Sequence, residues 1–146
     1  MRRASVLLLT IALVAGCGGG SSERLTRDQY AARADAVCSK YKQKTDALER
    51  PSDMAGLAHI ADQTLSILHD ARGDLHKLRP PANEQGTADA WLDQFDLLIK
   101  DIEQLRDKAK ANDIPAVQAI AKTSLEHNAH ANELGVQLGM TVCSKD

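Results

Sequence analysis

Apolar side chains recur every three or four residues along four long stretches of the sequence, and this spacing limits the fold more than any other feature. Residues spaced in this way lie on one face of a helix. The clearest stretch carries Trp91, Leu92, Phe95, Leu98, Ile99, Ile102, Leu105 and Ala109. No stretch alternates with a period of two residues, and no Asn-Gly or Asp-Gly pair marks a hairpin. The sequence therefore predicts an all-α fold.

Capping residues and prolines predict where the four helices begin and end. Thr26 and Gln29 form a capping box at the start of the first helix, which ends near Arg50 because Pro51 cannot continue it. The other three helices are expected to begin near Ser52, Thr87 and Asp113. Four long helices joined by short links predict an antiparallel, up-down-up-down four-helix bundle over residues 27–146.

The start of the chain has the layout of a secretory signal. Arg2 and Arg3 are followed by an apolar run over residues 6–14, and small residues come before Cys17. An uncleaved membrane helix is the alternative, but a run of about ten residues is too short to cross a hydrocarbon core of about 30 Å. The chain is therefore expected to be exported.

The four residues at 14–17, Val-Ala-Gly-Cys, resemble the bacterial lipobox, in which the cysteine is acylated before cleavage on its N-terminal side. The resemblance implies that residues 1–16 are a lipoprotein signal peptide and that Cys17 carries the lipid. Several acyl chains on one residue give stable membrane attachment. Residues 17–26, rich in Gly and Ser, are expected to form the lipidated N-terminus and a flexible tether.

Lipidation of Cys17 would leave Cys38 and Cys143 as the only other cysteines. Such a pair is expected to form a disulfide outside the cytoplasm. A redox-active pair is the alternative, but the chain has no Cys-x-x-Cys motif. Cys38 should lie about 18 Å along the first helix at about 1.5 Å per residue. To reach it, the C-terminal tail must turn at Gly135 or Gly139 and run back along that helix.

The net charge of the chain argues against nucleic acid and anionic lipid headgroups as partners. Without residues 1–16 the chain keeps 16 basic against 20 acidic residues, so it is acidic and shows no basic cluster for nucleic acid or anionic lipid headgroups. The acidic residues of the third helix are expected on its solvent face. They are Asp89, Asp93, Asp96, Asp101 and Glu103.

Two histidine pairs are candidate metal ligands: His127 and His130, three residues apart on the fourth helix with Glu126 and Glu133 beside them, and His69 and His76, seven residues apart on the second. The group on the fourth helix could bind Zn or Cu weakly, but histidines exposed on a polar helix are much commoner. The spacing does not match the Glu-x-x-His pairs of di-iron bundles, and no covalent haem motif is present. No nucleophile and base combination stands out, so neither an enzyme nor a cofactor is predicted. Trp91 and Phe95 are interpreted as core residues.

Two resemblances bear on function. Residues 25–38, 75–82 and 138–143 together resemble a family of small secreted lipoproteins of actinobacteria, with one cysteine in the first helix and one near the C-terminus. This resemblance implies a disulfide-closed bundle and no particular activity. Leu25-Thr26-x-x-Gln29 is also similar to the motif of periplasmic stress chaperones of the Spy and CpxP type, which carry it twice, whereas this chain has it once.

Together these features predict a lipoprotein held on the extracytoplasmic face of the cell membrane through Cys17. We expect it to act as a binding or structural module of the cell envelope, with a protein of the envelope as a possible partner. The alternative is a chaperone-like or metal- or haem-binding bundle.

Overall fold

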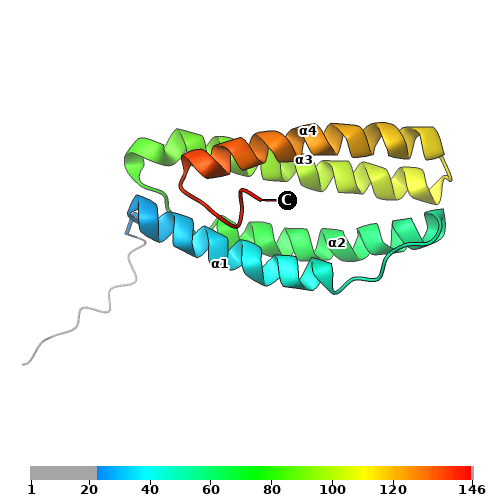
Figure 1. Ribbon diagram of the computed structural model, residues 1–146, viewed down its shortest axis with the longest axis horizontal. Helices are drawn as coiled ribbons and strands as arrows, with labels where there is room; N and C mark the ends of the chain where they lie inside the picture. Colours follow the sequence, from blue (N-terminus) through cyan, green and yellow to red (C-terminus); the bar gives the residue numbers. More distant parts are fainter. Residues whose placement is uncertain (1–22, 146) are drawn as a thin grey trace, which may run out of the picture.

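The computed structural model describes residues 23–145. The predicted signal peptide, Cys17 and most of the tether lie outside the described residues. Within residues 23–145 the chain forms α-helices and one short 3-10 helix, η1, and no strand. The α-helices are α1 (Arg27–Asp46), α2 (Met54–Leu75), α3 (Gln85–Lys110) and α4 (Ile114–Gln137). They run alternately in opposite directions (Figure 1), which confirms the predicted antiparallel four-helix bundle.

The predicted caps of the first and last helices are present. The Thr26 hydroxyl accepts a hydrogen bond from Gln29 N, and the Gln29 side chain accepts one from Thr26 N at 3.0 Å. Asp113 caps α4 by accepting from Ala116 N at 3.2 Å. Both helices therefore begin at a side chain that satisfies backbone N–H groups which the helix itself leaves unpaired.

Three predicted helix ends are displaced. α1 ends at Asp46, before Arg50, because the chain needs the intervening residues to cross to α2 and because the residue before Pro51 disfavours helical backbone angles. α2 is capped by Asp53, whose carboxylate accepts from Gly56 N at 2.7 Å, and not by Ser52. α3 begins at Gln85, before the expected Thr87, because η1 (Ala82–Glu84) leads directly into it.

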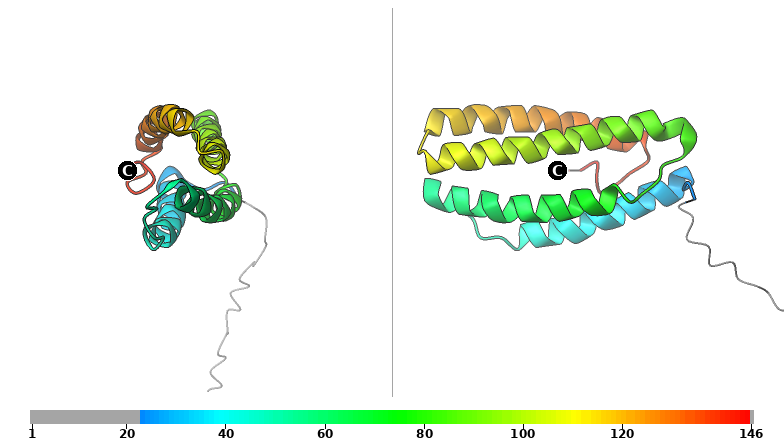
Figure 2. Two further views of the ribbon diagram at one scale, coloured as in Figure 1. Left: turned by 90° about the vertical axis from the view of Figure 1, so that its right-hand side faces the viewer. Right: turned by 180° about the vertical axis from the view of Figure 1, so that it is seen from behind.

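The helices pack in chain order. α1 packs on α2, α2 on α3 and α3 on α4, which gives two helix pairs that face each other (Figure 1). The remaining side of the bundle, between α1 and α4, is occupied by the C-terminal tail, residues 139–145 (Figure 2). This tail returns along α1 and takes the place that direct packing of α1 on α4 has in a regular bundle.

Small side chains allow the helices to approach one another around a few large ones. The connected core consists of Tyr30, Ala31, Ala34, Leu75, Ala88, Trp91, Ala131, Leu138 and Met140. Two of these residues, Leu138 and Met140, follow α4 in the chain. The tail is thus part of the hydrophobic core, and its burial contributes to stability in the same way as that of a helix face.

The turn into the tail occurs at Gly139, one of the two predicted positions. Gly139 has a φ of 80°, in the left-handed region where glycine is strongly favoured. Gly139 N donates to Val136 O at 3.0 Å, and Met140 N donates to Gly135 O at 2.9 Å. This pair of bonds is the Schellman arrangement that satisfies the last carbonyl groups of a helix.

The tail brings Cys143 to Cys38 on α1, where the two sulfur atoms are 2.04 Å apart, the length of a disulfide bond. The Cα atoms of the pair are 5.4 Å apart and the bond closes a sequence separation of 105 residues. The predicted pairing is thus accommodated by the bundle, together with the predicted return of the tail along the first helix.

Replacement of both Cys38 and Cys143 by Ser is expected to lower the free energy of unfolding by about 4–5 kcal/mol, because a bond that closes a loop of about 100 residues restricts the unfolded chain to that extent. Urea denaturation followed by circular dichroism, on protein lacking residues 1–22, measures the difference. Reduction of the unaltered protein should give the same decrease. A change below about 1 kcal/mol would contradict the expectation.

Candidate functional site

A partly open, mainly apolar cavity of about 340 Å³ lies between the helices beside the C-terminal tail. All four helices and the tail contribute to its wall. Its apolar lining includes the buried residues Leu75 of α2, Trp91 of α3 and Ala131 of α4 and the half-buried Phe95 of α3. Cavities of this size and lining are typical of small-molecule sites in proteins, including sites between the helices of bundles.

The tail forms one wall of the cavity, and Asp35 on α1 holds it there. The Asp35 carboxylate accepts four hydrogen bonds, from Thr141 N at 2.8 Å, Thr141 Oγ1 at 2.9 Å, Val142 N at 2.9 Å and Cys143 N at 3.0 Å. Val142 and both bridged cysteines line the cavity. The Asp35 carboxylate and the Cys38–Cys143 disulfide therefore fix the position of the tail at the cavity.

These hydrogen bonds change the ionisation of Asp35. Partial burial raises the pKa of its carboxyl, but the bonds donated by Cys143, Thr141 and Val142 together lower the pKa by more, so it lies below its usual value. Because the pKa is lower in the folded protein than in the unfolded chain, ionised Asp35 stabilises the docked tail above a pH of about 4. This contribution is lost as the pH falls through the lower pKa of the folded state.

Asp35→Asn is expected to lower the free energy of unfolding by about 1–2 kcal/mol at pH 7, since an amide oxygen is a weaker acceptor than a partly exposed carboxylate. The difference from the unaltered protein should shrink as the pH falls through the lowered pKa of Asp35 in the folded protein, because that carboxylate then also becomes neutral. Hydrogen exchange of the Thr141, Val142 and Cys143 amides should become faster in the variant. Asp93→Asn, at an exposed position of α3, is the control. Unchanged amide protection would show that Asp35 does not hold the tail.

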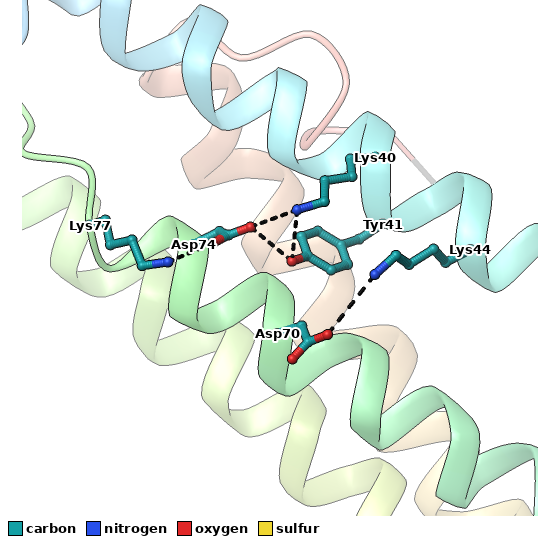
Figure 3. A network of polar contacts seen from close by, with 6 residues as sticks. All are labelled: Lys40, Tyr41, Lys44, Asp70, Asp74 and Lys77. Atoms are coloured by element: carbon teal, nitrogen blue, oxygen red, sulfur yellow. Dashed lines mark hydrogen bonds and ion pairs between the residues drawn. The ribbon is translucent and has the colours of Figure 1, made fainter.

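Tyr41 lines the cavity, and its hydroxyl binds Asp74 (Figure 3), a residue that is not among those lining the cavity. The hydroxyl donates to Asp74 Oδ2 at 2.8 Å, and the same oxygen accepts from Lys40 Nζ at 2.9 Å. Lys77 donates to the other oxygen of Asp74 at 2.8 Å. The bonds from Lys77, Lys40 and Tyr41 hold the pKa of the Asp74 carboxyl well below its usual range. This network fixes Tyr41, which is only 6% exposed, as an aromatic wall residue.

The polar residues that line the cavity are Lys42, Thr45 and Asp46 of α1, Asn128 and Asn132 of α4, and Lys145 of the tail. Lys42 and Asp46 form an ion pair in which Nζ lies 2.8 and 2.7 Å from the two carboxylate oxygens. The side chains of this pair are 54% and 60% exposed, so the pair lies toward the solvent.

Histidine 127 does not lie on a polar surface as the sequence suggested. Its Nδ1 is 2.7 Å from Oδ2 of Asp101, an interhelical bond between α4 and α3. Asp101 is 6% exposed, so its predicted place on the solvent face is wrong: the imidazole supplies the partner that a buried carboxylate requires. His130 is exposed. Among residues 23–145 no group of three or more His, Cys, Asp or Glu residues is placed to hold a metal ion.

The interpretation of Trp91 and Phe95 as core residues is confirmed for Trp91, which is 2% exposed, while Phe95 is half-buried. The two rings lie with their centroids 6.4 Å apart. Both also line the cavity, a role that the sequence interpretation missed. One feature of the sequence indicated the cavity: Asn128 interrupts the apolar stripe of the fourth helix, and in the structure Asn128 lines the cavity.

No protein-family model matches this sequence, and no curated protein and no solved structure is significantly similar to it. The similarity to small actinobacterial lipoproteins therefore stays a prediction. In the described part of the chain, no helix combines the length and the apolar character that crossing a membrane requires.

Proposed function

We propose that the mature protein is a lipoprotein anchored on the extracytoplasmic face of the cell membrane through Cys17, and that it binds a small apolar ligand in the cavity. The cavity is the observation that carries the binding role. The lipobox-like residues at 14–17 and the bridged pair Cys38–Cys143 support the location, because a structural disulfide fits an oxidising compartment.

The size of the cavity limits the ligand. An engineered apolar cavity of about 150 Å³ holds one benzene molecule, so by proportion the cavity of about 340 Å³ has room for about a dozen carbon-sized atoms. An elongated chain fits the arrangement of the walls, because the lining residues extend along α1 from Val37 to Asp46.

The expected affinity follows from the burial of that chain. About ten buried methylene groups at about 0.8 kcal/mol each give at most about 8 kcal/mol, from which the cost of association is subtracted. The dissociation constant should therefore be micromolar or weaker. Such an affinity suits a module tethered beside a membrane, where molecules with apolar chains are concentrated.

Titration with straight-chain alcohols that carry a terminal bromine tests the binding role. Trp91 is the only tryptophan of the chain and lines the cavity, so a bromine atom brought into contact with it should quench the fluorescence of the protein. Affinity should rise by up to about fourfold per added methylene group and level off near about twelve carbons.

Two matched variants locate the bound chain. Ala131→Leu fills the cavity and should abolish quenching, whereas Ala129→Leu adds the same side chain at an exposed position of the same helix and should leave it unchanged. Val37→Phe is a second way to fill the cavity if Ala131→Leu folds poorly, as circular dichroism would reveal. Equal quenching in all four proteins would contradict binding in the cavity.

Replacement of Cys17 by Ser is expected to move the protein from the membrane fraction to the soluble extracytoplasmic fraction, because no acyl chain can then be attached. Mass spectrometry of the unaltered protein should show an acylated Cys17 as the first residue. An unmodified protein in the culture medium would contradict the anchoring.

A further inference from the structure

We infer that two copies of this chain associate through the outer face of α4, with the two α4 helices antiparallel and related by a two-fold axis at Leu125. The main helical neighbour of α4 is α3, so a broad part of the surface of α4 is left exposed. The inference concerns this surface and does not depend on a ligand in the cavity.

The most exposed large apolar side chains within residues 23–145 all lie on α4. Ile114 is 49% exposed, Leu125 70% and Val136 62%. Each is eleven residues from the next. At about 3.6 residues per turn, eleven residues make almost three full turns, so the three side chains form a row along the helix. Single exposed apolar residues are common on protein surfaces, whereas an aligned row is typical of an interaction surface.

The row has the same order of residue types in both directions from Leu125. Residues of like kind lie at equal distances before and after it: Ile114 and Val136 at eleven residues, Gln118 and Asn132 at seven, and Ala121 and Ala129 at four. All these spacings belong to one helix face. If one α4 is turned end over end onto another, large apolar residues meet large apolar residues, amides meet amides and alanines meet alanines. A two-fold interface requires this self-complementarity.

The charges beside the row favour the antiparallel order. Lys122 and Glu126 lie on one flank of the row, are exposed, and make no ion pair with another residue of 23–145. Turning one helix end over end about Leu125 keeps this flank on the same side, and brings Lys122 of each copy within one turn of Glu126 of the other. In a parallel pair the charged flank would face the opposite flank, where Ser124 and Asn128 are uncharged.

A second copy suits this face better than a membrane surface does. Glu126 and Glu133 lie beside the row, whereas helices that lie on membranes carry mainly basic residues there. One helix face makes a small interface, so association should be weak in solution. The proposed anchor at Cys17 would strengthen it, because two copies held on one membrane have a higher effective concentration.

Cross-linking through introduced cysteines tests the contact and its direction. The chain from residue 17, with Cys17→Ser to prevent acylation, is purified with its native disulfide intact and then oxidised at high concentration. Leu125→Cys should link to itself, because the two-fold axis places both copies of residue 125 side by side. Ala121→Cys and Ala129→Cys should link when they are mixed and much less when each is alone.

Two results of this experiment would overturn the inference. If each alanine variant links to itself as readily as to the other, the helices are parallel. If Leu125→Cys links no more than Thr123→Cys, which is at an exposed position of α4 away from the row, the face does not meet a second copy.

Sedimentation equilibrium over a range of concentrations tests the energetics. Leu125→Asp should raise the dissociation constant of the dimer at least about tenfold, since both copies lose their central apolar contact and two like charges meet at the axis. Thr123→Asp adds the same charge away from the row and should leave the constant unchanged. Lys122→Glu should raise it about threefold or more, and adding Glu126→Lys should restore it, because the exchanged charges again form pairs.

Circular dichroism of each variant establishes that it is folded. An unaltered protein that stays monomeric at every concentration would show that the inference is wrong, as would a combined charge exchange that fails to restore association. Binding of the unaltered monomer to uncharged phosphatidylcholine vesicles, lost in Leu125→Asp, would assign the face to lipid instead. None of these results bears on the cavity, which is tested separately by the quenching of Trp91.

Discussion

The structure depends on how the side of the bundle between α1 and α4 is closed. In a regular four-helix bundle these two helices would pack against each other, whereas here the tail lies between them and contributes Met140 to the core, next to Leu138 at the end of α4. The tail has no regular secondary structure to satisfy its own backbone, so the Asp35 carboxylate binds three consecutive N–H groups and Cys38 fixes the end covalently. A tail is narrower than a helix, and the space left beside it is the cavity.

Most of the fold could be predicted because it follows from local rules. Helical periodicity gave the four helices, and the side chains of Thr26 and Asp113 gave two of their starts. The return of the tail was predictable for another reason. A disulfide between Cys38 and Cys143 requires the two residues to lie close together, and few paths of the C-terminal segment bring Cys143 near Cys38. Two of the three ends that moved, at Asp46 and Gln85, lie where the connecting segment determines how many residues the helix includes.

The cavity and the contact between Asp101 and His127 could not be predicted because both depend on what lies opposite a residue. Periodicity assigns a residue to a stripe, but it does not tell whether the space in front of a small residue such as Ala71 or Ala131 is filled. Asp101 was assigned to the solvent face by its charge alone. The packing of α4 on α3 places His127 against Asp101. Because the imidazole supplies a hydrogen-bond partner, the carboxylate can be buried without a large desolvation cost.

The proposed compartment and the proposed site are physically coupled. The wall of the cavity includes the disulfide itself, so oxidation of the two cysteines helps to fix that wall. Before oxidation the tail would be held by Asp35 and by the burial of Leu138 and Met140, and closing a loop of this length without a covalent bond carries an entropic cost. Under the proposed function, apolar ligands would meet an incomplete site during synthesis and a complete one after export, so that binding would be confined to the side of the membrane on which the lipid anchor would hold the protein.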